Sequence, residues 1–352
     1  MSVAAASDAA RARRSFTTSR GRTLSFTCLG LGTATLGNMG RVLSEAEADA
    51  VLEGAWTNGV GYIDTAPLYG HGLAEIRVGR ALRGTRRDDV LLSTKVGRVL
   101  SPCRAGDEDS GIYLAPPPFR VTFDYSYDGV MRSIDASLAR LGVDRVDTLF
   151  VHDLEPGAHG STYEARWSEL THGGWRALDD LRAAGAVAAV GMGVNQAAPC
   201  ERMLAELDPD LFLLAGRYTL LEQAPLHGLL PACERRGVGV VVGGPYNSGV
   251  LARRGGWYDY ARPPAEVLAK VDRLAAVCNE LGVSLQAAAL QFPIAHPAVV
   301  SVIPGGQTSE EVRANGELMA ERIPDELWAR LKAEGLLDAA APTSTWQARL
   351  AC

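Results

Sequence analysis

Eight short apolar runs recur along this chain, and an amphipathic helical segment separates each run from the next. The runs are almost continuously apolar rather than alternating, which is typical of parallel strands that are buried on both faces. Strands that alternate with helices along most of a 352-residue chain predict an α/β fold made of one (β/α)8 TIM barrel. We expect the strands at residues 26–32, 61–65, 90–95, 146–152, 186–193, 211–216, 237–244 and 299–305.

A second arrangement, a doubly wound sheet followed by another domain, also contains alternating strands and helices. It requires a linker between the domains, and no segment reads as such a linker. We therefore predict a single catalytic barrel domain at residues 21–338. Residues 1–20, which begin Ala-, Arg- and Ser-rich and lack a long apolar stretch, are expected to form a disordered leader. In the C-terminal tail at 339–352, Trp346 could fold back over the barrel mouth, and fraying is the alternative.

Two of the expected helices have clear boundaries in the sequence. Ser44 and Glu47 have the spacing of a capping box, and Asn58–Gly59 indicates the end of the helix that follows. Residues 128–142 place apolar side chains three and four positions apart and end on Gly142. Both segments are therefore predicted to be amphipathic helices on the outside of the barrel.

A long segment after the third strand, residues 101–127, breaks the regular alternation. Loops of this length in compact domains are usually functional or disordered. The segment is rich in proline and aromatic residues, which favours an ordered, packed loop. Substrate specificity is expected to reside here, and we predict that Phe119, Phe123 and Tyr125 contact the substrate.

Polar side chains end three consecutive predicted strands. Asp64 lies at the end of one strand, Lys95 ends the next and His152 ends the one after it, while Tyr69 follows Asp64 by five residues. The carboxyl ends of parallel barrel strands meet at one mouth, where polar residues tend to be catalytic. We therefore expect these four side chains to form one site.

The four residue types suit a coupled transfer of a proton and a hydride. A lysine beside a tyrosine is expected to lower the phenol pKa, an aspartate keeps the lysine charged, and a histidine donates a hydrogen bond to a substrate oxygen. Two other interpretations exist. Asp64 and Lys95 could form an inert buried ion pair, or Lys95 could form a Schiff base, as in an aldolase.

Composition excludes several classes of partner. The net charge of −6 shows no basic character that would suit nucleic acid or an anionic membrane. No apolar run approaches the roughly 20 residues that span a bilayer. The six cysteines have no metal-binding spacing, which indicates that no metal is bound and that the protein is cytoplasmic. We expect a small-molecule substrate and predict no nucleic-acid, membrane or protein partner.

Three segments together resemble the aldo-keto reductase superfamily: GYIDTAPLYGHGLAEIRVG at 61–79, STK at 93–95 and LFVHD at 149–153. The resemblance extends from about residue 26 to residue 335 and implies an NAD(P)-dependent oxidoreductase.

The resemblance also implies a role for each of the four polar residues. Tyr69 matches the proton donor or acceptor of the family, and Lys95 matches the residue that lowers its pKa. Asp64 matches the partner of that lysine, and His152 matches the residue that orients the substrate oxygen. Because all four identities are intact, a non-catalytic regulatory protein is the less favoured interpretation.

A narrower resemblance is to the bacterial aldose 1-dehydrogenase group, which includes L-fucose, D-threo-aldose and pyridoxal 4-dehydrogenases. Residues 29–40, 116–142 and 150–160 carry it. This resemblance implies oxidation of a cyclic hemiacetal to a lactone, with an aldose such as L-fucose or D-arabinose, or pyridoxal, as substrate. The alternative is an NADPH-dependent reductase of aldehydes and ketones.

No Rossmann fingerprint is present, because residues 30–37 and 191–196 both lack a correctly spaced third glycine. The resemblance implies instead a nicotinamide dinucleotide that extends across the barrel mouth, near Gly32 and Thr33, with Asn195 binding its carboxamide. A glycine-rich turn runs into a helix after the last strand and suits a phosphate group. The residues assigned to the cofactor in this segment are Gly305, Gly306, Gln307, Thr308, Glu311 and Asn315.

The same segment bears on the choice between NAD and NADP. Relatives that prefer NADP commonly carry lysine or arginine here, whereas this chain has Glu311, and Arg313 is the nearby base. A carboxylate repels a phosphate, so we favour NAD, with NADP possible. Alternatively, Glu311 forms a capping box with Thr308 and is uninformative about the cofactor. Gly243 stands where many relatives place an aromatic residue that stacks on the nicotinamide, and Tyr246 could substitute for it.

Overall fold

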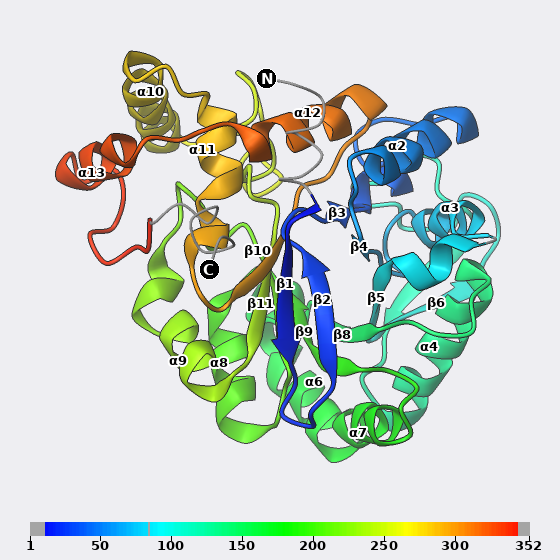
Figure 1. The fold of residues 1–352 in the computed structure, drawn as a ribbon. Coiled ribbons are helices and arrows are strands. Elements are labelled where there is room, and N and C mark those ends of the chain that lie inside the picture. The colour runs from blue at the N-terminus through cyan, green and yellow to red at the C-terminus, as the bar shows by residue number, and fades with distance from the viewer. Residues whose placement is uncertain (1–10, 84, 344–352) are drawn as a thin grey trace.

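Eight parallel strands form the predicted barrel in the computed structural model, which describes residues 11–83 and 85–343 (Figure 1). Their order around the barrel follows the chain. The barrel closes where the Gly30 amide donates to the Val302 carbonyl and the Val302 amide donates to the Cys28 carbonyl, each at 2.9 Å. The strands are β3 (Leu31–Gly32), β4 (Tyr62–Asp64), β5 (Leu91–Val96), β8 (Thr148–His152), β9 (Ala189–Val194), β10 (Leu211–Ala215), β11 (Gly239–Gly243) and β12 (Val299–Ile303).

An antiparallel hairpin precedes the barrel and corrects the expected leader. Strand β1 (Arg13–Thr17) pairs with β2 (Thr23–Thr27), so residues 13–17, which we assigned to a disordered leader, are ordered. The hairpin side chains Phe16 and Phe26 share a buried cluster with Tyr62 inside the barrel. Burial of these aromatic rings orders the hairpin, and the first barrel strand is consequently shorter than the predicted 26–32. Residues 1–10 and Trp346 lie outside the described residues.

Helices cover the outside of the barrel (Figure 1). The capping box at the start of α2 is confirmed, since the Ser44 hydroxyl accepts from the Glu47 amide and the Glu47 carboxylate accepts from the Ser44 amide. Helix α4 ends at Gly142, as the sequence predicts, and this glycine adopts the left-handed conformation. The helices are α2 (Glu45–Thr57), α3 (Leu73–Ala81), α4 (Tyr127–Leu141), α5 (Pro156–His159), α6 (Tyr163–Glu169), α7 (Trp175–Ala183), α8 (Ala197–Glu206), α9 (Leu229–Arg236), α10 (Ala265–Glu280), α11 (Leu285–Gln291), α12 (Ser309–Ala320) and α13 (Asp325–Ala333).

The alternation of side chains along each strand places the polar strand ends inside the barrel. On β8, Leu149 and Val151 belong to the cluster between barrel and helices, whereas Phe150 belongs to the inner cluster. His152, two residues after Phe150, therefore also points inward. The same alternation applies to Asp64, which follows the inward Tyr62 by two positions.

The long segment after the third barrel strand is ordered, as expected, and contains a second hairpin. Strands β6 (Arg98–Pro102) and β7 (Phe119–Phe123) pair antiparallel. The loop between them returns to the first-strand loop, where the Leu114 amide donates to the Asn38 carbonyl at 3.0 Å and the Asn38 side chain donates back at 3.2 Å. These contacts bring part of the segment to the barrel mouth.

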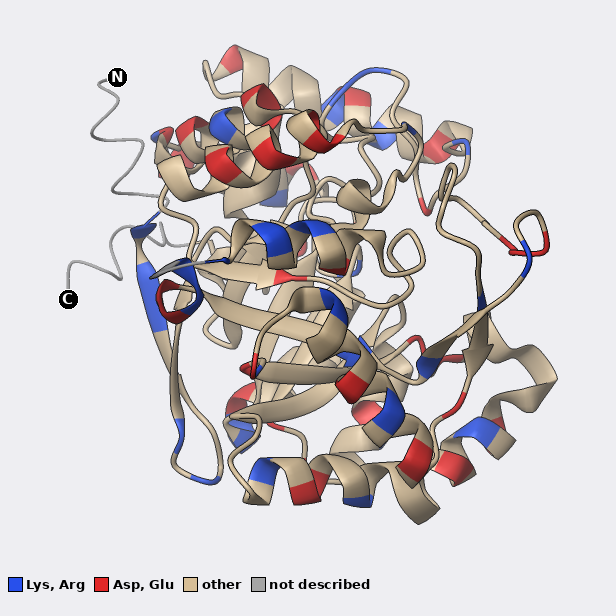
Figure 2. Cartoon of the chain, turned by 90° about the vertical axis from the view of Figure 1, so that its right-hand side faces the viewer, with Lys and Arg blue, Asp and Glu red and all other residues tan. Residues whose placement is uncertain are grey.

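Acidic and basic residues are intermixed over the helices on the face shown in Figure 2. Many form exposed ion pairs, such as Arg80 with Asp49 at 2.7 Å, each of which contributes about 0–1 kcal/mol to stability. None of the described helices combines the length and the apolar character that a membrane span requires. Within residues 11–83 and 85–343, no three His, Cys, Asp or Glu side chains are grouped to hold a metal ion.

Candidate active site

A cavity of about 170 Å³ opens at the carboxyl ends of the barrel strands. Tyr69, Lys95 and His152 contribute to its wall, together with Asn195 at the end of β9. Asp64 lies behind this wall and is almost completely buried, with 1% of its surface exposed. The structure thus brings together the four residues that the sequence predicts to meet.

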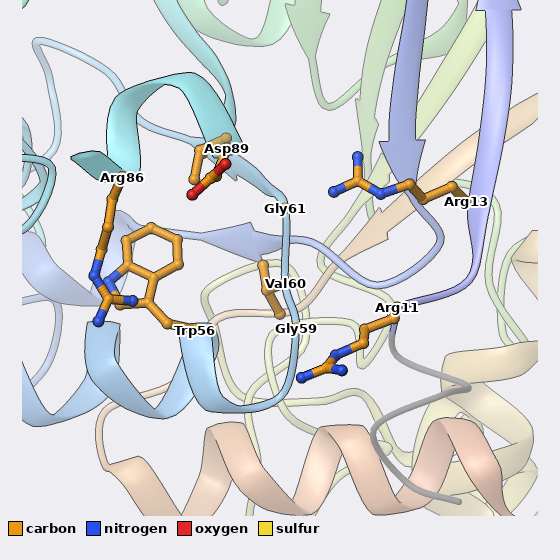
Figure 3. Close-up of a pocket in the computed structure, with 9 residues that line it drawn as sticks. Arg11, Arg13, Trp56, Gly59, Val60, Gly61, Arg86 and Asp89 are labelled. Atoms are coloured by element: carbon orange, nitrogen blue, oxygen red, sulfur yellow. The ribbon is translucent and has the colours of Figure 1, made fainter. Parts of the chain in front are cut away.

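A larger cavity of about 480 Å³ lies at the opposite end, beside the amino ends of β4 and β5 (Figure 3). Two of the three arginines that line it, Arg86 and Arg13, have partners within the protein. Arg86 lies 5.6 Å from the centroid of the Trp56 ring and pairs with Glu53 at 3.2 Å, and Arg13 donates to the Ser25 carbonyl at 2.9 Å. Active sites of such barrels lie at the carboxyl ends of the strands, so the smaller cavity is the candidate active site.

Lys95 is the centre of the polar network. Its Nζ donates to Asp64 Oδ2 at 2.5 Å, to the Thr65 carbonyl at 2.9 Å and to Tyr69 Oη at 3.1 Å. An ammonium group has three N–H donors, and these contacts use all of them. An ammonium with this set of acceptors has no free electron pair, which argues against the Schiff-base interpretation. Ser93 holds the other Asp64 oxygen at 2.8 Å.

Tyr69 is positioned by a close approach of two glycines. Gly70 has φ 61°, which favours glycine, and a Cβ added to it would lie 2.4 Å from the Gly37 carbonyl oxygen. A Cβ on Gly37 would likewise lie 2.5 Å from the backbone of Tyr69 and Gly70. The turn after β4 therefore packs directly on the first-strand loop and fixes the direction of the phenol.

The rings of Tyr69 and His152 meet edge to face, with centroids 5.8 Å apart and planes at 84°. His152 is buried, its Nδ1 has no hydrogen-bond partner among the described residues, and its Nε2 lies 3.5 Å from Asp153 Oδ2. Both rings line the cavity. A substrate oxygen in the cavity could therefore contact the phenol and the imidazole together.

The protonation states follow from burial. Burial lowers the pKa of His152 to about 3; the charges of Lys95 and Arg98 act in the same direction, and Asp153 opposes them. Burial also raises the pKa of Tyr69 well above its usual range, and the charge of Asp64 adds to this effect. The imidazole is therefore neutral and the phenol protonated at neutral pH.

The expected depression of the Tyr69 pKa is thus wrong for this structure. Lys95 donates to the phenol at 3.1 Å, but its shortest contact is with Asp64, and the negative charge of that carboxylate raises the pKa of the phenol. The loss of solvation of the phenolate is then the dominant contribution. Burial raises the pKa of Asp64 as well, although Lys95 and Ser93 oppose this shift.

Asn195 lies at the cavity wall and is held by a buried carboxylate that sequence reasoning missed. Its backbone amide donates to Glu155 Oε2 at 2.8 Å, and its Nδ2 donates to Glu155 Oε1 at 3.0 Å. Burial raises the pKa of Glu155, and the bonds from Asn195 oppose that rise. Within the described residues, these contacts leave the amide oxygen of Asn195 available to accept a hydrogen bond from a ligand.

The glycine-rich turn after β12 packs on the loop that follows β3. The Thr35 hydroxyl donates to the Gly306 carbonyl, and Gln307 Nε2 donates to the Met39 carbonyl, both at 2.7 Å. Gly305 packs closely beside the same threonine: a Cβ added to this glycine would lie 3.3 Å from the Thr35 methyl group. The turn therefore forms one edge of the barrel mouth.

Thr308 caps α12, and Glu311 lies at the start of that helix. The Thr308 hydroxyl accepts from the Glu311 amide at 3.1 Å, and the Glu311 carboxylate accepts from the Gln307 amide at 2.8 Å. The first half of the expected capping box is therefore present, while the carboxylate bonds one residue earlier than expected.

Other residues assigned to the cofactor have partners within the protein. Gly32 pairs with Asp64 between β3 and β4. The amide and the hydroxyl of the buried Thr33 both donate to the Asp64 carbonyl, at 3.0 and 2.9 Å. Asn315 is buried and accepts from the Tyr246 hydroxyl at 2.7 Å. Thr33 thus supports the backbone of the site, and Tyr246 is engaged by α12.

The three aromatic residues expected to contact substrate do not line the cavity. The Tyr125 hydroxyl is buried and donates to the His152 carbonyl at 2.7 Å, so this ring supports the site from behind. Phe123 packs against Arg98, and Phe119 lies at the far end of β7. The cavity wall instead contains Tyr113 from the same segment and Tyr260 from a later loop. The composition of the segment favoured an aromatic contact but could not distinguish these rings.

Comparison with known proteins agrees with this geometry. The aldo/keto reductase family model matches residues 28–334. Pyridoxal 4-dehydrogenase from Microbacterium luteolum is 45% identical over 334 residues, which cover 90% of this chain and 96% of that protein. D-threo-aldose 1-dehydrogenase from a Pseudomonas species is 40% identical over 316 residues, which cover 88% and 94%.

The fold comparison gives the same result. The solved holo form of an aldo-keto reductase from Bacillus halodurans matches with a TM-score of 0.71 and 25% identity, over 93% of this chain and 96% of that one. Aldo-keto reductases bind nicotinamide cofactors. The chain therefore belongs to the aldo/keto reductase family and is an oxidoreductase.

Proposed function

We propose that the protein oxidises a cyclic hemiacetal to a lactone, with an aldose such as L-fucose or D-arabinose, or pyridoxal, as substrate. The observation that carries the proposal is the network in which Lys95 joins Asp64 to Tyr69 beside a neutral His152. The names of the two relatives, a pyridoxal dehydrogenase and an aldose dehydrogenase, support this substrate class.

The residues at the barrel mouth fit a nicotinamide dinucleotide. The amide oxygen of Asn195 can accept from a carboxamide N–H, and the turn at Gly305 and Gly306 presents backbone beside the start of α12, where a phosphate is favoured. A nicotinamide held there would supply the acceptor for a hydride from the substrate carbon.

The protein side chains then handle the proton and the orientation of the substrate. His152 is neutral, and the nearby Asp153 carboxylate favours the tautomer with hydrogen on Nε2, which can donate to the substrate oxygen. The phenolate form of Tyr69 accepts the hydroxyl proton of the hemiacetal, and the hydrogen bond from Lys95 stabilises this phenolate. Burial of the site excludes water from these groups.

The pH dependence of the reaction follows from the Tyr69 pKa. Because this pKa is raised, Tyr69 is mostly protonated at neutral pH. The fraction of phenolate, the form that accepts the proton, therefore increases as the pH rises. We expect the rate of oxidation to rise between about pH 7 and about pH 10. His152, with a pKa of about 3, stays neutral between about pH 5 and about pH 7, so its protonation should not lower the rate in that range. Initial rates with saturating dinucleotide measure this profile, and a rate that falls with rising pH would contradict it.

We also propose NAD as the preferred dinucleotide, because the Glu311 carboxylate lies at the start of α12 and would repel a 2′-phosphate. Replacing Glu311 with Lys should lower the KM for NADP⁺ about ten-fold, since it exchanges repulsion for attraction. Glu311→Gln is the matched control, which removes the charge and retains an acceptor for the Gln307 amide. An unchanged NADP⁺ to NAD⁺ ratio in both variants would show that Glu311 does not face the 2′ position.

A second candidate function is the reduction of aldehydes or ketones with NADPH. The observation that favours it is the protonated phenol of Tyr69, which is ready to donate a proton to a carbonyl oxygen. Absorbance of the reduced nicotinamide distinguishes the two functions. Purified protein should reduce NAD⁺ with L-fucose, D-arabinose, L-galactose or pyridoxal. No turnover with this panel, together with aldehyde-dependent oxidation of NADPH, would support the reductase instead.

A further inference from the structure

Asp153 places a second carboxylate in the wall of the active-site cavity. It follows His152 directly and has φ 50°, a left-handed conformation that is uncommon for a residue other than glycine. Its backbone amide donates to the Gly193 carbonyl at 2.9 Å, and its own carbonyl accepts from the Glu155 amide at 2.9 Å. Residues in this conformation persist where their surroundings hold them, and they are concentrated at functional sites.

Arg98 binds one oxygen of this carboxylate. Its Nη2 and Nε donate to Asp153 Oδ2 at 2.7 and 3.0 Å, and His152 Nε2 lies 3.5 Å from the same oxygen. Phe123 supports the guanidinium, which lies 4.4 Å from the centroid of its ring. Within the described residues, this arrangement leaves Oδ1 as the oxygen with free acceptor capacity.

The carboxylate is ionised, although it is nearly buried. Burial opposes its ionisation, but interactions with His152 and Arg98 outweigh this and hold the pKa of Asp153 below its usual range. An ionised carboxylate only accepts hydrogen bonds. The side chains of Met39, Leu68 and Ile112 in the same wall are apolar. Asp153 is therefore suited to accept a hydrogen bond from a hydroxyl group of the ligand.

The distance to His152 indicates which hydroxyl would be bound. The reacting substrate oxygen is held by His152, and Asp153 lies 3.5 Å from that imidazole. Oxygens on adjacent carbons of a sugar are about a hydrogen-bond length apart. The hydroxyl on the carbon next to the reacting carbon is thus within reach of the carboxylate.

We propose that Asp153 accepts a hydrogen bond from the hydroxyl group next to the reacting carbon, and that it thereby selects 2-hydroxy substrates over their deoxy analogues. This inference rests on the aldose part of the proposed function, since pyridoxal has no hydroxyl group on the carbon next to its reacting carbon. The β6–β7 hairpin then contributes to substrate selection, because its first residue, Arg98, holds the Asp153 carboxylate in position to bind the substrate hydroxyl.

A matched pair of sugars tests the proposal. D-Arabinose and 2-deoxy-D-ribose differ at the 2-hydroxyl and share the remaining stereocentres. A hydrogen bond to a charged group corresponds to a preference of about ten- to hundred-fold. We expect wild-type kcat/KM to favour D-arabinose by about this factor, and the ratio to collapse towards one in Asp153→Asn. Asp49→Asn, which removes a carboxylate from an exposed ion pair with Arg80, is the control that should retain the wild-type ratio.

Two outcomes would overturn the proposal. The first is a wild-type enzyme that uses both sugars equally, which needs no variant and therefore does not depend on whether Asp153→Asn folds. The second is a variant that loses activity equally on both sugars, which would make Asp153 a positioning residue for His152.

The same comparison in the direction of reduction separates this proposal from the proposed function. 2-Hydroxypropanal and propanal differ by one hydroxyl, and their reduction by NADH or NADPH requires no hemiacetal oxidation. If neither of these sugars, nor L-fucose, L-galactose or pyridoxal, is oxidised with either dinucleotide, the proposed function fails. A loss of 2-hydroxypropanal preference in Asp153→Asn would still support the role of Asp153, and an unchanged preference would refute it.

Discussion

Replacing Tyr69 with Phe is expected to lower kcat by a factor of about 10²–10⁴, the usual contribution of general acid–base catalysis. The substitution removes the oxygen that accepts the Lys95 hydrogen bond at 3.1 Å and that exchanges a proton with the substrate in the proposed mechanism. The ring that packs edge-on against His152 remains. Dinucleotide binding should therefore change little, because the contacts of Asn195 and of the turn after β12 do not involve Tyr69.

The measurement is single-turnover formation of reduced nicotinamide, together with fluorescence titration of the dinucleotide. Tyr113→Phe is the matched control, because it removes a second phenol from the cavity wall, with its ring centroid 6.4 Å from that of Tyr69. It should cause a much smaller loss. Turnover by Tyr69→Phe at the wild-type rate would disprove the assigned mechanism, and equal losses in both variants would indicate a general disturbance of the cavity.

Replacing Lys95 with Met is expected to destabilise the fold by about 3–5 kcal/mol, the cost of leaving one charge of a buried pair without its partner. Lys95 and Asp64 are each 1% exposed, and the ammonium is the only cation within 2.5 Å of that carboxylate among the described residues. The variant should also lose activity, because Tyr69 loses its hydrogen-bond donor. Urea unfolding followed by circular dichroism measures the change in free energy.

The pH dependence of this variant has a defined sign. In wild type, burial already raises the pKa of Asp64, and removal of Lys95 takes away a charge that lowers it. The carboxyl in the variant should therefore bind a proton more readily when folded than when unfolded, so lowering the pH should recover stability. A double variant, Lys95→Met with Asp64→Asn, should be more stable than Lys95→Met alone. If Lys95→Met has the same free energy of unfolding as wild type, the ion pair between Lys95 and Asp64 is not required for the stability of the fold.

Part of the active site could be predicted from sequence for a local reason. Asp64, Lys95 and His152 each end a nearly continuous apolar run, and the ends of parallel strands in a barrel must converge. Their inward direction also follows from the alternation of side chains along a strand, which the buried neighbours Tyr62 and Phe150 confirm. The family resemblance added the proposed roles of these residues and the proposed location of the cofactor turn.

The contacts between distant segments were decided by the tertiary structure. The β1–β2 hairpin is ordered because Phe16 and Phe26 pack against buried residues inside the barrel. No local sequence pattern at residues 13–17 indicates this packing. Tyr113 and Tyr260 reach the cavity only because their loops fold back over the mouth. Aromatic composition correctly indicated an ordered loop but could not determine which rings face inward.

The electrostatics of the site also depended on the three-dimensional arrangement. The strand order, the polar strand ends and the family could be inferred from the sequence, because these depend on periodicity and on motifs that are short in sequence. Only the fold decided that Tyr69 has a raised rather than a lowered pKa, that Glu155 holds Asn195, and that Arg98 binds Asp153. Burial and pairing across long sequence separations set these properties, and both arise only once the chain has packed.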